Sequence, residues 1–237
     1  ICVLLSCKNK KEEKQIALTT PTIEEFKTTF DSTLVDSFFE THPLLQKYQA
    51  DVKKLYQKHQ YHYVWFDKNG INEFANLLYD RINNLDEEGL QIKVPYKDKL
   101  EEIHNNIDKK QNPNIEAELL NSSLYFFYAM NVYHGLDTDK SSEIEWYIPR
   151  KKQSYVSYLD SLLTNPSLIN RDEKNLISQY FLLKKALQKY RQIEKNGGWN
   201  TIAIDTAVRS YKVGDSAAAI VQIRERLYLS DDIKANS

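Results

Sequence analysis

Cysteine is the residue type that most restricts the chemistry open to this 237-residue chain. Its two cysteines are Cys2 and Cys7, so no thiol nucleophile occurs anywhere after position 7. Neither cysteine stands beside other soft ligands, as a zinc site requires, and neither can link distant parts of the chain by a disulfide. Any thiol-based catalysis is therefore excluded from the body of this sequence.

The first seven residues are apolar and end in a small residue and a cysteine, and a lysine-rich stretch follows at once. A run this short cannot span a bilayer, which takes about 20 residues, but it is typical of the end of a signal peptide. Leu4-Leu5-Ser6-Cys7 resembles a bacterial lipobox; the other interpretation is a chance match at a chain end. We therefore predict a signal-peptide end over 1–7, lipid attachment at Cys7 and a flexible tether over 8–20.

The remaining polar residues do not form a catalytic or metal-binding group that the sequence can identify. His59 and His62 share a helical-turn spacing but lack a third ligand nearby, so we expect structural or surface roles. Glu143 and Glu145 precede Trp146, a pattern that suggests a carbohydrate-cleaving pair of acids beside a stacking ring, but a polar loop gives no reason for one acid to stay protonated. We predict no catalytic residue, no metal and no cofactor.

Composition limits the class of protein. The 32 basic and 33 acidic residues leave a formal charge of −1, which gives no electrostatic case for a nucleic-acid partner. With 41% hydrophobic residues the chain is apolar enough to bury a core. Six glycines and six prolines are few for this length and disfavour a turn-dense β fold.

Apolar residues recur every three or four positions over most of the chain, which predicts a mostly α fold. The pattern begins after Pro21 and runs through Leu34, and Ile115–Tyr133 is apolar on more than one face, as a central buried helix would be. Tyr61–Phe66 is short and aromatic, and predicts an extended piece closed by an Asn-Gly turn. The other predicted helices lie at Leu45–Leu55, Ile71–Leu85 ending near Gly89, Leu100–Ile107, around Leu159 and Leu162, at Leu176–Ile193, and through Ile223 and Leu227.

Gly197 and Gly198 mark a predicted boundary between a helical domain over 21–196 and a smaller unit over 197–237. We do not expect the smaller unit to fold alone, because such short helices bury little surface. Trp199 follows the two glycines and either stacks on a ligand or plugs the joint between two helical units. The joint is favoured, since two glycines allow close backbone approach.

Several motifs occur in a recognisable order between about residues 45 and 233: Tyr56, Tyr63-Val64-Trp65-Phe66, Gly70-Ile71-Asn72, Glu88-Gly89-Leu90, Glu118-Leu119-Leu120, Tyr180, Tyr190-Arg191, Gly197-Gly198-Trp199, Gly214-Asp215, and Arg226-Leu227. Together they resemble the large L,D-transpeptidases that carry a helical scaffold domain before a cysteine catalytic domain. The resemblance implies a scaffold domain over 21–196 and part of a peptidoglycan-binding-like helical unit over 197–237.

The family's Ser/Thr-His-Gly-Cys motif has no counterpart here, so no catalytic residue is carried over and this chain should be inert alone. What the resemblance implies for a full-length parent is cross-linking of peptidoglycan stem peptides through a cysteine acyl-enzyme, without a metal. We expect a truncated parent enzyme, held by Cys7 on a membrane at the periplasmic side of the bacterial envelope. The alternative is a stand-alone, non-enzymatic envelope lipoprotein that binds peptidoglycan or an envelope protein.

Overall fold

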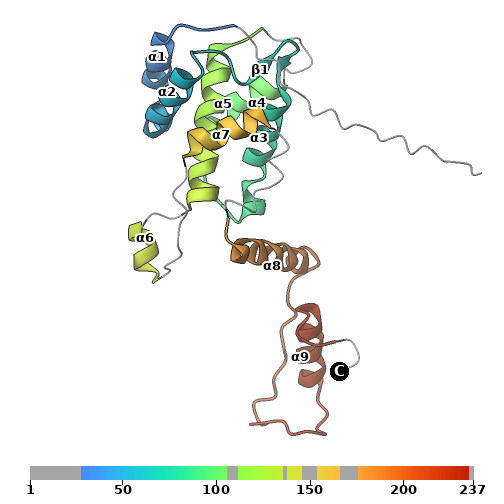
Figure 1. Ribbon diagram of the computed structural model, residues 1–237. Coiled ribbons are helices and arrows are strands. Elements are labelled where there is room, and N and C mark those ends of the chain that lie inside the picture. Colours follow the sequence, from blue (N-terminus) through green and yellow to red (C-terminus); the bar gives the residue numbers. More distant parts are fainter. Residues whose placement is uncertain (1–27, 106–111, 136–137, 146–153, 166–175, 235–237) are drawn as a thin grey trace, which may run out of the picture.

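The structure is a computed structural model that describes residues 28–105, 112–135, 138–145, 154–165 and 176–234. It is mostly helical and contains one two-stranded sheet, which confirms the predicted fold class (Figure 1). The elements in chain order are α1 (Thr33–Thr41), η1 (Pro43–Tyr48), α2 (Gln49–Lys58), β1 (Phe66–Asp67), β2 (Gly70–Ile71), α3 (Glu73–Asn83), η2 (Leu85–Glu88), α4 (Lys97–Asn105), α5 (Ile115–Tyr128), η3 (Ala129–His134), α6 (Thr138–Glu143), α7 (Tyr155–Thr164), α8 (Ser178–Lys195) and α9 (Ala218–Leu229).

Helix α5 is the centre of the fold, as its apolar sequence predicted. It packs against α1, α2, α3 and α4, and from Ala117 to Tyr128 every side chain is buried. Asn114 begins the helix by accepting hydrogen bonds from the backbone of Glu116 and Ala117, the usual role of an N-cap. The segment continues as the π-helical turn η3 and ends at Gly135, whose φ is +71°. We call α1–α5, α7 and their connections the bundle.

Two buried polar residues of α5 each donate a hydrogen bond to a carbonyl of their own helix. Ser123 Oγ donates to the carbonyl of Leu119 at 2.7 Å, and Asn121 Nδ2 donates to that of Ala117 at 2.9 Å. Bonding back to the carbonyl four residues earlier satisfies these donors locally. The rest of the core is aliphatic and aromatic, and its largest fully buried side chains include Trp65, Tyr56, Phe39, Phe66 and Phe126.

The first helix begins later than the sequence predicted. Pro21, Ile23 and Phe26 lie outside the described residues, and residues 28–32 are not helical. Thr29 instead forms an isolated antiparallel bridge with His62, and α1 starts at Thr33. The prediction over Pro21–Leu34 was thus wrong for residues 28–32, because pairing with a distant segment replaces the local helical pattern.

The predicted extended piece and turn form a small hairpin. Phe66 pairs with Ile71 and Asp67 with Gly70, so Lys68 and Asn69 are the turn residues. Asn69 N donates to the Asp67 carboxylate at 2.6 Å. An Asn-Gly turn would have Asn69 and Gly70 as its two central residues. Gly70 is instead the first residue of β2.

Helix α8 rests on the bundle through η2. Glu88 accepts hydrogen bonds from Tyr180 and, at 2.7 Å, from Lys184, and Arg191 pairs with Asp86 at 3.6 Å. Gly89 ends η2 with a φ of +79°. Beyond α8 the chain leads to α9, well away from α5 (Figure 1). We call residues 176–234 the arm.

Candidate functional site

The joint between α8 and α9 contains the residues that the sequence singled out. Trp199 contacts Tyr190 of α8 edge to face, with ring centroids 6.3 Å apart, and the Arg226 guanidinium of α9 lies 5.7 Å from the indole. Arg226 also donates to the carbonyl of Asn200. The indole keeps 42% of its surface exposed. Trp199 thus lies between the two helices and still presents an aromatic face to solvent.

The two glycines of the joint serve its backbone conformation. Gly197 has a φ of +109° and Gly198 a φ of +74°, values that residues with a Cβ rarely adopt. A Cβ on either would meet no atom within 4 Å. The glycines are therefore needed for a left-handed chain reversal and not, as the sequence suggested, for close backbone approach.

The far end of α9 is tied back to α8. Lys189 pairs with Asp231 at 3.0 Å and donates to the carbonyl of Ser230. Ile193 is the buried side chain of α8, and Ala219 that of α9. The arm is thus held together mainly by polar contacts and the Trp199 joint.

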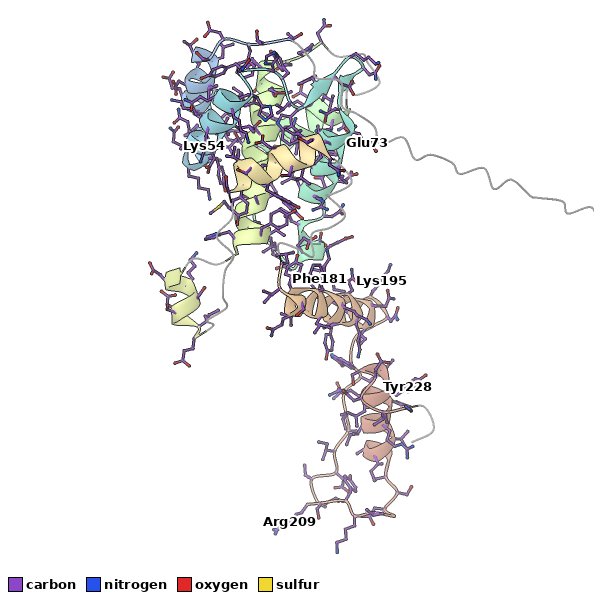
Figure 2. All side chains as sticks on the ribbon, viewed as in Figure 1. Lys54, Glu73, Phe181, Lys195, Arg209 and Tyr228 are labelled. Atoms are coloured by element: carbon purple, nitrogen blue, oxygen red, sulfur yellow. The ribbon has the colours of Figure 1, made fainter. Side chains whose placement is uncertain are left out.

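Apolar surface gathers on the arm in the part of the chain that the structure describes. Figure 2 shows its side chains projecting outward from the two helices, and Leu182 is 68% exposed. Basic residues outnumber acidic ones, ten to six, over residues 176–234. The other large hydrophobic side chains exposed on the arm are Ile177, Leu183, Tyr190, Trp199, Ile204, Val208, Val213, Val221, Ile223, Tyr228 and Leu229.

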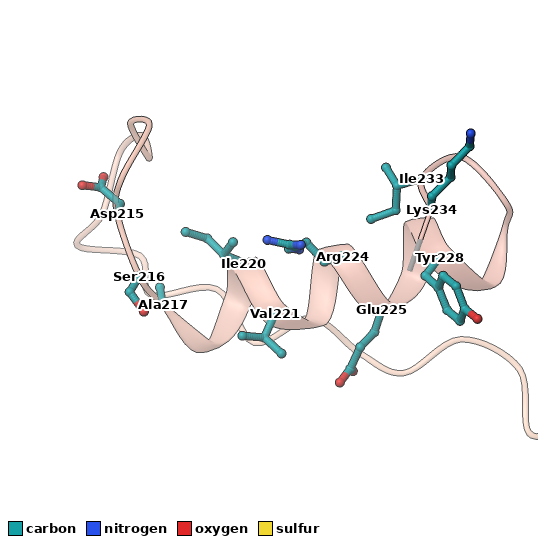
Figure 3. Close-up of a pocket in the computed structure, with 10 residues that line it drawn as sticks. All are labelled: Asp215, Ser216, Ala217, Ile220, Val221, Arg224, Glu225, Tyr228, Ile233 and Lys234. Carbon is teal, nitrogen blue, oxygen red and sulfur yellow. The ribbon is translucent and has the colours of Figure 1, made fainter. Parts of the chain in front are cut away.

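A pocket of about 600 Å³ lies along α9 (Figure 3). Its walls combine apolar side chains with Arg224, Glu225 and Asp215, and the figure shows the Arg224 guanidinium beside Ile220. A second groove of about 980 Å³ lies on the bundle, between η2 and the segment Leu90–Asp98. Both are open surfaces with mixed lining and without a nucleophile and base in hydrogen-bond contact.

The most elaborate polar cluster is buried inside the bundle and was not predicted as a site. Glu118 of α5 is completely buried and accepts hydrogen bonds from Tyr56 Oη at 2.7 Å, Val64 N at 2.6 Å and Trp65 N at 3.1 Å. Ser122 Oγ lies 2.6 Å from Tyr56 Oη and accepts from Trp65 Nε1 at 2.7 Å. We call these residues the Glu118 network.

Burial dominates the acidity of this network. It raises the pKa of Glu118 to about 7 against the opposing effect of its three donors. Burial, reinforced by the negative charge of Glu118, also raises the pKa of Tyr56 well above its ordinary value. Tyr56, Trp65 and Glu118 come from three separate motifs of the family resemblance, and the fold brings them together.

His59, His62 and His104 occupy structural positions in the bundle. His59 Nε2 lies 2.6 Å from Asp160 of α7, which also pairs with Lys58, so this cluster ties α7 to α2. His62 Nδ1 lies 2.8 Å from the carbonyl of His59. His104 stacks on Tyr79, and burial lowers its pKa.

No group of metal-ligating side chains occurs in the described ranges. Glu143 and Glu145 are exposed, and Trp146 and Cys7 lie outside the described residues. Within those same residues, the helices are too short or too polar to cross a lipid bilayer. The geometry therefore offers surfaces for binding and a rigid frame, but no assembled catalytic group in the part that the structure describes.

Comparison with curated proteins and with solved structures gave no match. A family model described as "Scaffold domain" matches residues 50–187, from α2 through most of α8. This match spans more than half of the chain and covers the Glu118 network and the bonds of Tyr180 and Lys184 to Glu88, consistent with the scaffold domain of L,D-transpeptidases. The chain belongs to the scaffold-domain family.

Proposed function

We propose that this chain is the non-catalytic scaffold region of a lipid-anchored L,D-transpeptidase, which positions the catalytic part of the enzyme for cross-linking peptidoglycan stem peptides. Cys7 is the proposed point of lipid attachment, on the periplasmic side of a bacterial membrane. Tethering raises the local concentration of an enzyme at its polymer substrate without a new contact at the active site.

The observation that carries this proposal is the difference between the bundle and the arm. The bundle has a closed apolar core, which suits a rigid frame, whereas the arm exposes leucine, tyrosine and tryptophan side chains such as Leu182, Tyr190 and Trp199. Exposed apolar surface of this kind marks interaction sites. The arm is thus the proposed surface against which the wall polymer or the catalytic part is placed.

The cysteine content supports a non-catalytic role. Acyl transfer by an L,D-transpeptidase needs a thiolate, and the two cysteines at positions 2 and 7 lie in the proposed export signal. The transferase chemistry is therefore assigned to a catalytic domain supplied by the parent enzyme. Metal chemistry has no role in the proposal.

The test is an in-frame deletion of the coding region for residues 28–234 in the native gene, followed by analysis of muropeptides from purified sacculi. We expect the cross-links made by the parent enzyme to decrease, with the lipidated protein still in the membrane fraction. The purified 237-residue chain should produce no new cross-links from muropeptides. Turnover by this chain with its first 20 residues removed would overturn the proposal.

The alternative function, a stand-alone lipoprotein that binds peptidoglycan or an envelope protein, is favoured by the basic, aromatic surface of the arm. It predicts that the purified chain sediments with sacculi and that Trp199→Ala weakens this binding, while deleting the gene leaves the cross-link pattern unchanged. Replacing Cys7 by alanine tests the anchor in both cases, since it should move the protein from the membrane to the soluble fraction.

A further inference from the structure

Glu118 joins three separate segments of the bundle. Its carboxylate on α5 accepts hydrogen bonds from the Tyr56 hydroxyl of α2 and from the backbone amides of Val64 and Trp65. The segment Tyr61–Phe66 is therefore held against α5 by this buried carboxyl group and by the bond that the Trp65 indole donates to Ser122. Removing these bonds would leave two buried backbone amides without an acceptor.

Among the residues that the structure describes, no cation pairs with the negative charge of an ionised Glu118. The ionisable groups that face it are Tyr56 from α2 and Tyr63 from the segment before β1, while its neighbour on α5 is the hydroxyl of Ser122. None of the ion pairs in the described residues includes Glu118. A buried, unpaired charge is costly, so the burial raises the pKa of this carboxyl to about 7.

The network can stay hydrogen-bonded in both protonation states. With Glu118 ionised, Tyr56 donates to the carboxylate. With Glu118 protonated, its hydroxyl donates to Tyr56 Oη, and Tyr56 in turn donates to Ser122 Oγ at 2.6 Å. The indole of Trp65 donates to Ser122 in either case. The two protonation states of Glu118 thus differ mainly in whether a negative charge is buried.

The same segment receives the chain that enters the bundle from its N-terminal side. Phe30 N donates to the carbonyl of Tyr61 at 3.0 Å, and Tyr63 N donates to that of Thr28 at 3.2 Å. The Phe30 ring packs edge to face on Tyr56, with centroids 4.9 Å apart. Residues 28–30 are therefore held on the bundle by the segment that Glu118 holds on α5.

We propose that Glu118 is a proton-linked latch: when protonated it fastens Tyr61–Phe66 and residues 28–30 to α5, and loss of its proton favours local opening of this junction. Opening of the junction lets water reach the carboxylate, because it separates the carboxylate from the Val64 and Trp65 amides that donate to it. The chain entering at residue 28 is then held less tightly at neutral than at mildly acidic pH.

Amide hydrogen exchange of the whole 237-residue protein, measured by NMR and corrected for intrinsic exchange rates, tests the latch. Between pH 5.5 and pH 8 the protection factors of the Val64 and Trp65 amides should fall by more than about tenfold. The reason is that the equilibrium constant for opening rises up to tenfold for each pH unit between the Glu118 pKa of the open state and that of the closed state. The amides of α9, which lies in the arm and outside the bundle, serve as a control and should not change. In Glu118→Gln the fall should disappear.

Ser122→Ala provides a second variant in case Glu118→Gln does not fold. It removes the acceptor that Tyr56 needs when Glu118 is protonated, so the midpoint of the change should move to lower pH. A ¹³C NMR titration of the Glu118 carboxyl gives that midpoint directly. Unchanged protection in the wild type, or an unchanged midpoint in Ser122→Ala, would contradict the latch.

Discussion

Helices α5 and α8 are both rich in leucine and aromatic residues, yet they are stabilised in different ways. Nearly all of α5 is buried, whereas Ile193 is the buried residue of the longer α8. The sequence of α8 is rich in lysine, leucine and glutamine, which favour helices in solution. Helix α5 depends on packing, and α8 depends on its intrinsic helix propensity and a few polar contacts with η2.

The same difference extends to the two regions that contain these helices. In the described residues, acidic side chains exceed basic ones in the bundle, and the reverse holds for the arm. The bundle keeps its apolar groups inside, while the arm leaves most of its large ones in contact with solvent. The bundle is stabilised by its own buried core. The arm, whose apolar side chains are exposed, is suited to contacts with another molecule or domain.

The largest expected effect comes from comparing one leucine-to-alanine substitution in each region. Leu120→Ala in α5 should lower the free energy of unfolding by about 2–5 kcal/mol, because it leaves a cavity at a fully buried site. Leu182→Ala in α8 should change it by less than about 0.5 kcal/mol, because that side chain is 68% exposed. Urea unfolding of both variants measures the difference, and equal losses would show that the arm is packed in solution.

The stability of the bundle should depend on pH through Glu118. Its pKa is raised from 4.5 to about 7 in the folded state, so the folded protein binds the proton more tightly than the unfolded one. Its contribution is complete below about pH 4.5 and is lost as pH rises to about 7, a total of about 3 kcal/mol. Unfolding curves from pH 4.5 to 8 should show this decrease in the wild type.

Glu118→Gln serves as the matched variant for this measurement, since it keeps the shape and cannot ionise. The decrease between pH 4.5 and 7 should be absent in it. A decrease of the same size would assign the pH dependence to another group and not to the Glu118 network.

Trp199→Ala should affect the arm and leave the bundle unchanged. Loss of the contacts with Tyr190 and Arg226 removes about 1–2 kcal/mol from the α8–α9 joint. Hydrogen exchange of the α9 amides should therefore accelerate, while that of the α5 amides stays as it is. Slow exchange throughout α9 in the variant would mean that other contacts hold the joint.

The smallest effect is expected from the ion pair between Lys189 and Asp231. Both groups are partly or largely exposed, so Lys189→Ala should destabilise the arm by less than about 1 kcal/mol. The effect should shrink further in high salt. Limited proteolysis of α9 at low and high salt measures it, and a salt-independent loss would point to the bond with the Ser230 carbonyl instead.

The sequence predicted much of the bundle because several of its signals are local. The all-round apolar character of Ile115–Tyr133 correctly indicated the central helix, and Gly89 and Gly135 end helical segments at the predicted positions. The start of α1 was wrong because residues 28–30 pair with a segment more than 30 positions away. The spacing of apolar residues along the sequence does not indicate pairing between such distant segments.

What the sequence alone determined is the mostly helical fold, the order of its elements, and the absence of a thiol after position 7. Only the tertiary structure decided that Glu118, Tyr56 and Trp65 share one buried network, and that Leu182 and Leu183 of α8 remain exposed. The physical reason is the same in both cases: hydrophobic spacing tells which face of a helix is apolar, but whether that face is covered, and which polar group is buried beneath it, depends on residues far away in the chain.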